Sequence, residues 1–181
     1  ASNKSIIAYS SASYMDMCGG NLLLANPVGV CFDAGKLVNE RIKNDMDGLI
    51  IVYASGGVVA SNLKEGNLSV KESSTGKSFV LNLRNAFDFS TFKNWAREEE
   101  ATVFQTHLLS FNDSILVYTN GSTNARQRRL LAVCKDEDGS IIHCLINLAG
   151  SHTLYDATTK VSDYLKKIED MDWRVGQHTD G

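Results

Sequence analysis

The pattern of residues 128–150, RRLLAVCKDEDGSIIHCLINLAG, constrains the fold more than any other stretch. Two apolar runs of strand length flank Asp138-Gly139, where glycine can adopt a positive φ without a Cβ clash. A turn is also expected at Ala34-Gly35, a two-residue turn at Gly56-Gly57, and the end of a strand at Asn120-Gly121. Short strands joined by tight turns pair antiparallel, so the sequence predicts a mostly antiparallel twisted sheet.

Two segments have helical rather than strand periodicity. Residues 89–101 and residues 154–170 each place apolar side chains on one face and charged ones largely off it. Thr153 and Asp156 form an N-cap signature for the second helix, because the hydroxyl can accept an orphan N–H and the acid lies at the positive helix end. The apolar positions are Phe92, Trp95 and Ala96 in the first segment and Leu154, Val161, Leu165 and Ile168 in the second.

The sequence therefore predicts the α+β class, with a mostly antiparallel sheet and two main helices, about 89–101 and 154–170. No linker or repeat separates these elements, so we expect a single domain over residues 1–181. The 181 residues are 43% hydrophobic and 22% charged, which is enough apolar material for one globular core.

Charge and hydropathy argue against two classes of partner. The formal net charge is −3, whereas a protein that holds nucleic acid through its phosphates is normally basic. No apolar run approaches the roughly 18 residues that a membrane-spanning helix needs. We therefore expect neither nucleic-acid binding nor a membrane span.

Motifs for cofactors and metals are not recognisable. ESSTGKS resembles a phosphate loop, but Lys71 stands where the leading glycine is required, so a polar hairpin tip is expected there. The histidines lack metal-ligand spacing and the cysteines form no C-x-x-C pair, so we expect no cofactor and no metal. Disulfides are compatible with an even set of cysteines, but buried free thiols are the preferred interpretation for Cys18, Cys31, Cys134 and Cys144.

The segment NARQRR gathers three arginines just before a predicted strand. Because alternate residues of a strand face opposite sides, Arg126 and Arg128 are expected to share a face and Arg129 to point away. An arginine at a strand end can clamp a phosphate or carboxylate through two hydrogen bonds. A solvated strand end explains the same pattern equally well.

Three stretches of the second half, taken in order, resemble the phosphodiester glycosidase domain family, which includes the lysosomal uncovering enzyme. The stretches are ATVFQTHLLSFNDSI, then NARQRRLLAVCKDEDGSIIHCLINLAG followed by a helix, then WRVGQHTDG. Gln105 and Thr106 match the family's Gln-Ser/Thr strand, and Arg128 matches its Arg-x-x-x-Gly strand, with Ala132 in place of the glycine. Asp180 and Gly181 match the start of its Leu-Asp-Gly-Gly motif. The resemblance implies one domain over 1–181 that lacks the family's final strands.

The resemblance implies hydrolysis of a sugar–phosphate diester at the anomeric carbon and gives three residues catalytic roles. Arg128 would bind the phosphodiester and stabilise the leaving phosphate. Asp180 would act as nucleophile or base, or stabilise an oxocarbenium ion. His178, or else His107, would supply a proton near neutral pH. The substrate-binding residues would be Gln105, Thr106 and His107.

Two functions are therefore expected. The first is a phosphodiester glycosidase-like domain that hydrolyses or binds a sugar-1-phosphodiester or related glycan. The alternative is a non-catalytic structural or assembly component with a degenerate version of the same fold. An open sheet edge would then bind a protein partner or a second copy of the chain. The resemblance also implies a secreted or surface-associated protein.

Overall fold

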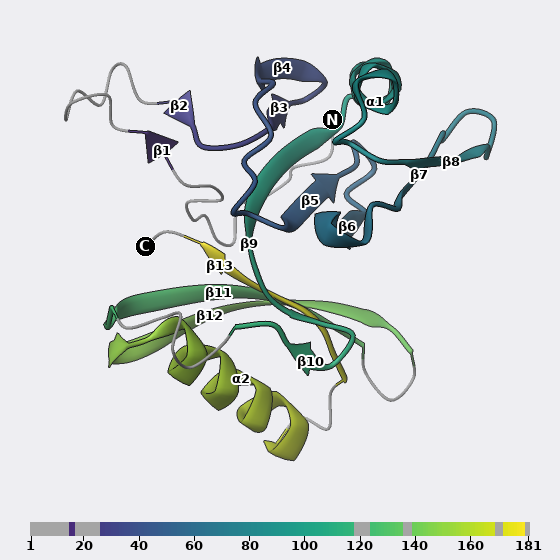
Figure 1. The fold of residues 1–181 in the computed structure, drawn as a ribbon. Helices are drawn as coiled ribbons and strands as arrows, with labels where there is room; N and C mark the ends of the chain where they lie inside the picture. The colour runs from purple at the N-terminus through teal and green to yellow at the C-terminus, as the bar shows by residue number, and fades with distance from the viewer. Residues whose placement is uncertain (1–14, 17–25, 118–123, 136–138, 169–171, 180–181) are drawn as a thin grey trace, which may run out of the picture.

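The computed structural model of the chain describes residues 15–16, 26–117, 124–135, 139–168 and 172–179 (Figure 1). Every strand pair in this part of the chain is antiparallel, and two main helices accompany the sheets, so the predicted α+β class is confirmed. The elements are β1 Met15–Asp16, β2 Asn26–Pro27, β3 Cys31–Asp33, β4 Lys36–Asn39, β5 Gly48–Val52, β6 Val58–Asn62, η3 Leu63–Glu65, β7 Leu68–Lys71, β8 Ser78–Leu81, α1 Ala86–Glu98, β9 Thr102–Phe111, β10 Ser114–Ile115, β11 Arg126–Lys135, β12 Ile141–His152, α2 Leu154–Ile168 and β13 Asp172–Thr179.

Strand β9 connects the two halves of the main sheet. The sheet order is β12-β11-β13-β9-β3-β4, and β5 and β10 also pair with β9. The first half of β9 pairs with β3 and β5, whereas its second half pairs with β13 and β10. Figure 1 accordingly shows β9 running from the half that carries α1 to the half that carries α2.

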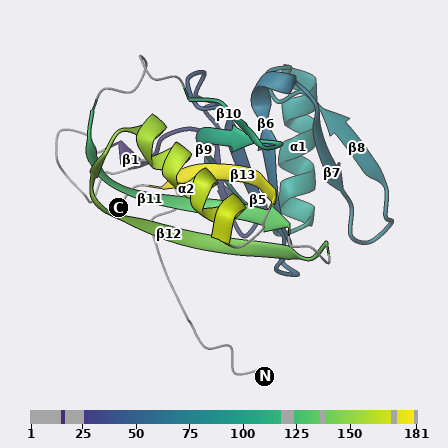
Figure 2. The same cartoon turned by 90° about the horizontal axis from the view of Figure 1, so that it is seen from below.

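Helix α2 covers one face of the half of the sheet that β11, β12 and β13 form (Figure 2). Alternate residues of β11 point toward this helix, as the period of a strand requires, and they pack on helix residues spaced by four. The buried members of this core are Leu109, Leu130, Ala132, Cys134, Ala157, Val161 and Leu165.

The other half has its own core beneath α1, in which the aromatic side chains of Phe32, Phe92 and Trp95 pack among aliphatic ones. Phe92 lies edge-on to Phe32, with ring centroids 5.9 Å apart, and stacks on Trp95 at 5.4 Å. Such pairs add about 0.5–1.5 kcal/mol each to the free energy gained by burial. The predicted apolar face of Phe92, Trp95 and Ala96 is thus confirmed as buried.

The predicted hairpins are largely confirmed. Residues 34–35 join β3 to β4, and β11 and β12 form the long hairpin around Gly139, whose φ is +83°. The turn between β5 and β6 differs in detail from the prediction. Tyr53 N–H donates to Gly57 O, so the loop has three residues and Gly56 alone adopts a positive φ, +92°. Asn120, Gly121 and Asp138 lie outside the described residues.

Both helices are confirmed, with shifted bounds for the first. Helix α1 begins at Ala86 rather than 89, because the Asn85 side chain caps it by accepting hydrogen bonds from the Phe87 and Asp88 N–H groups. It ends at Glu98 because Glu100 adopts a left-handed conformation with φ +49°. Helix α2 begins at Leu154 as predicted, and the Thr153 hydroxyl accepts a hydrogen bond from the Asp156 N–H at 3.1 Å.

We expect Glu100→Gly to stabilise the fold. Glycine adopts the left-handed conformation without the steric cost that glutamate bears, and this gain exceeds the added entropy of the unfolded chain, for a net of about 0.5–1 kcal/mol. Glu98→Gly is the matched control, because Glu98 is helical and its replacement should lower stability. Urea unfolding of both variants measures the difference, and equal destabilisation by the two would contradict the argument.

Candidate functional site

The strands that carry the predicted site residues are neighbours in the sheet. Strand β13 lies between β9 and β11 and pairs antiparallel with both. In this register His178 is opposite His107 on one side and Leu130 on the other, and Thr179 is opposite Arg129. The backbone thus brings the QTH, RQRR and QHT segments to one region of the sheet.

Gln105 is fully buried, and its amide is bonded to main-chain groups of two loops. The Oε1 atom accepts hydrogen bonds from the N–H groups of Val30, at 3.2 Å, and Lys43, at 2.9 Å. The Nε2 atom donates to the carbonyls of Lys43, at 2.6 Å, and Met46, at 2.5 Å. A Cβ at Gly29, whose φ is +93°, would lie 2.6 Å from Oε1, so only glycine fits there. In this arrangement the Gln105 amide joins β9 to the two loops.

The next two residues of β9 mark the point where this strand changes partner. Thr106 is buried and lies opposite Gly48 of β5, whereas His107 is half-buried and lies opposite His178 of β13. His107 is therefore the residue of the QTH segment nearest in register to the end of β13.

Arg128 is 5% exposed, unlike its exposed neighbour Arg126. Its Nε donates to the His152 carbonyl at 2.8 Å and its Nη2 to the Asn124 carbonyl at 2.5 Å. The pairing with β12 jumps between the two arginines, from His152 to Leu148, because β12 bulges there. The expected solvated strand end therefore fits Arg126. Arg128 is instead buried at the corner between β11 and β12, where it bonds to main-chain carbonyls. Arg129 donates from Nε to Asn147 Oδ1 at 2.7 Å.

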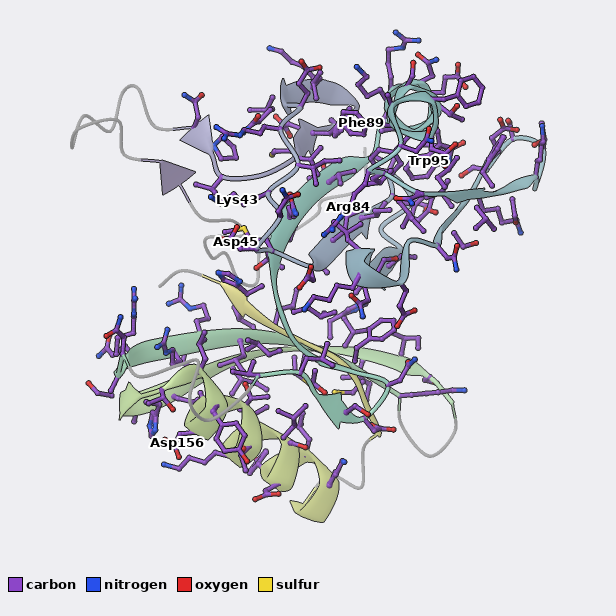
Figure 3. The ribbon with its side chains drawn as sticks, viewed as in Figure 1. Lys43, Asp45, Arg84, Phe89, Trp95 and Asp156 are labelled. Atoms are coloured by element: carbon purple, nitrogen blue, oxygen red, sulfur yellow. The ribbon has the colours of Figure 1, made fainter. Side chains whose placement is uncertain are left out.

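A cluster that we did not predict lies at the same corner, where β12 meets α2. The His152 ring contacts Asp156 Oδ2 through Nδ1 at 2.6 Å and the Ala149 carbonyl through Nε2 at 2.7 Å. Lys160 Nζ lies 3.3 Å from the same carboxylate oxygen. The His152 side chain is 13% exposed. Figure 3 shows Asp156 on α2, beside the ends of β11 and β12.

The electrostatics of this corner favour an ionised Asp156. The hydrogen bond from His152 is the main cause that lowers the pKa of this carboxyl, and the hydrogen bond and charge of Lys160 lower it further, against a smaller opposing effect of desolvation. The spacing of His152 and Asp156, four residues apart across a strand–helix junction, was visible in the sequence. Asp156 was interpreted there only as part of the helix cap.

For two of the predicted catalytic residues, His178 and Asp180, the structure describes no side chain. His178 belongs to β13 and its backbone position is given above, but its side chain lies outside what the structure describes. Asp180 lies outside the described residues altogether. The structure thus brings Arg128, His107 and the backbone of His178 into neighbouring strands.

In the part of the chain that the structure describes, no group of three or more His, Cys, Asp or Glu residues could hold a metal ion. Nor does any helix there have the length and apolar character needed to cross a membrane. Cys31, Cys134 and Cys144 are free thiols, but the preferred interpretation of buried free thiols is confirmed in full only for Cys134, because Cys31 and Cys144 are half-buried. Burial, together with the neighbouring Cys144, raises the pKa of Cys134 to about 12, so this thiol is a poor nucleophile.

A cavity of about 620 Å³ lies away from this corner, between the β3–β4 hairpin and α1. Lys36, Lys93 and Arg97 contribute its positive charges, and Phe32 and Leu37 contribute apolar surface. None of the predicted site residues whose side chains the structure describes lines it.

We expect Gln105→Leu to lower the free energy of unfolding by about 3 kcal/mol or more. The variant removes a partner of four main-chain groups, of which the Val30 N–H and the Met46 carbonyl are buried, and a buried polar group without a partner costs about 1–3 kcal/mol. Gln105→Glu should destabilise the fold as well, because a buried carboxylate cannot donate to the Lys43 and Met46 carbonyls. Urea unfolding gives both values, and a Gln105→Leu variant as stable as the original chain would contradict the structural role.

The comparisons with known proteins add no relative to this picture. No model of a known protein family matches the sequence, and no curated protein matches it significantly. The likeness to the phosphodiester glycosidases therefore stays a prediction that rests on the motif residues and their order.

Proposed function

We propose that this protein is a phosphodiester glycosidase-like domain that binds and hydrolyses a sugar-1-phosphodiester. The observation that carries the proposal is the position of β13 between β9 and β11. The three segments that resemble the family's motifs are far apart in the sequence, and this order makes them neighbours. This order supports the proposal, because the motifs of one active site must lie close together in space.

The chemistry of Arg128 fits the binding of a phosphodiester. Two of its hydrogen bonds go to main-chain carbonyls and orient the guanidinium, whose charge is permanent in proteins. A fixed cation stabilises negative charge that develops on a leaving group, and it does so best in a site shielded from water. Arg128 is therefore suited to hold the phosphate as the bond to the sugar breaks.

The proposed reaction needs water, a carboxylate and the arginine. Water adds to the anomeric carbon, the bond from this carbon to the phosphate oxygen breaks, and the phosphate leaves as a monoester. Asp180 would assist as nucleophile or base, or by stabilising the oxocarbenium ion. His178 or His107 would handle the proton, although a phosphate leaving group needs little protonation.

The test is the release of sugar from an N-acetylglucosamine-1-phosphodiester. We expect Arg128→Ala to lower the rate by roughly 100-fold or more, because a fixed charge that stabilises the transition state is lost. Arg129→Ala is the matched control, since Arg129 bonds to Asn147 instead, and its rate should stay within a few fold. Circular dichroism confirms that both variants fold. An undiminished rate in folded Arg128→Ala would reject this site.

A second function is favoured by the open edge of β12. This strand has 12 residues and, among the described strands, pairs only with β11. Ile141 and Leu145 on it are 55% and 41% exposed. A long edge strand with exposed apolar side chains accepts a further strand readily, so an assembly component is the alternative.

Measurement of molecular mass in solution separates the two functions. An assembly component should form a stable oligomer without hydrolase activity, and Leu145→Lys should dissociate it because a charge opposes strand addition at the edge. Ser69→Lys, at an exposed position of β7 and not on the β12 edge, is the control for added charge alone. An active monomer would reject the alternative.

A further inference from the structure

We infer that His152, doubly protonated and paired with Asp156, is a positioning residue that holds the main-chain carbonyl to which Arg128 is bonded. This inference rests on the proposed function for its catalytic meaning and names a form of regulation of the same site.

Both nitrogens of the His152 ring face hydrogen-bond acceptors. Nδ1 is 2.6 Å from a carboxylate oxygen of Asp156, and Nε2 is 2.7 Å from the Ala149 carbonyl oxygen. An ionised carboxylate and a carbonyl can only accept, so each ring nitrogen must carry a hydrogen. A neutral imidazole has a single N–H and would leave one acceptor facing a lone pair. The geometry is therefore that of an imidazolium.

The charged groups at this corner come from α2 and β11. Helix α2 contributes Asp156 and Lys160, which contact the ring. Strand β11 contributes Arg128, which bonds to the His152 carbonyl, and Arg126, whose backbone is opposite His152 in register. Lys160 Nζ is 3.3 Å from both the Asp156 oxygen and His152 Nδ1, but an ammonium can only donate, so it bonds to the carboxylate. Asp156 is thus the counter-ion of both the ring and Lys160.

The ring and the Arg128 contact belong to the same residue. The His152 carbonyl accepts the bond from Arg128 Nε, while the ring ties Ala149, at the start of the bulge, to Asp156, in the first turn of α2. Gly150, inside the bulge, has a φ of +82°. The two ring bonds therefore fix the backbone that presents this carbonyl. Loss of one proton breaks one of them and frees the carbonyl to move.

The direction of the pH effect follows from the two titrating groups. The lowered pKa of Asp156 means that the pair stabilises the fold above the range where an unfolded aspartate ionises, near pH 3.9, and that this stability is lost as the pH falls through the lower pKa of the folded state. Both ring bonds require a hydrogen on each ring nitrogen, so the corner is intact, and Arg128 is held best, while the ring is an imidazolium.

The first test needs no substrate. Nitrogen-15 NMR of the full chain from pH 5 to pH 9 should show an imidazolium ring for His152 on the acidic side. The Arg128 Nε–H resonance should be slow to exchange there and should broaden or shift as His152 loses its proton. A His152 ring that is neutral at pH 5–6, or an Arg128 resonance that ignores its titration, would overturn the inference. The failure of the proposed function would leave this result intact.

The second test measures how the affinity for the ligand depends on the protonation of His152. The affinity for an N-acetylglucosamine-1-phosphodiester should fall roughly tenfold as His152 deprotonates, which is the effect of losing one charge-assisted hydrogen bond. Asp156→Asn should move this transition to lower pH, and His143→Gln, an exposed histidine of the same strand, should leave it unchanged. A transition unmoved in Asp156→Asn would reject the device, whereas an absence of any binding would reject the proposed function.

Discussion

The four hydrogen bonds of the Gln105 amide are the interaction on which the rest of the structure depends. They join the middle of β9 to the main chain at Val30, Lys43 and Met46. Val30 and Met46 are buried there and Lys43 is half-buried, and a buried main-chain group without a partner costs about 1–3 kcal/mol. One side chain thus supplies hydrogen bonds to main-chain groups of two loops that lie outside the strands. Gly29 approaches this amide closely, which requires the absence of a Cβ.

Strand β9 transmits that constraint to the candidate site. Between Thr106 and His107 its partner changes from β5 to β13, so the same strand that is fixed by Gln105 sets the position of β13. Strand β13 in turn pairs along β11, whose first residues carry the arginines. The position of Arg128 therefore depends on a chain of main-chain pairings. Each link involves residues distant in sequence, which makes the site a product of the whole sheet rather than of one loop.

Elements with a local cause were predictable from the sequence, whereas the bonding of the polar side chains was not. The β11–β12 hairpin and α2 follow from apolar periodicity and a turn glycine, and Asn85 with Asp88 was a readable start signal for α1. The end of α1 had no such signal, because glutamate occupies the left-handed position that glycine usually takes. Gln105 matched a substrate-binding motif, yet its partners lie 59, 62 and 75 residues away along the chain, and no local pattern in the sequence indicates them.

The charges at the Arg128 corner bear on which function the fold supports. Arg128, Lys160 and the His152 imidazolium are cations, while Asp156 supplies one negative charge, so these four side chains carry a net positive charge in a chain of net charge −3. A buried guanidinium such as that of Arg128 costs solvation free energy, because the charge leaves water. An anion that bound here would offset part of that cost, and a phosphodiester carries a single charge suited to a bidentate guanidinium. The positive charge of this corner therefore supports the proposed binding of an anion.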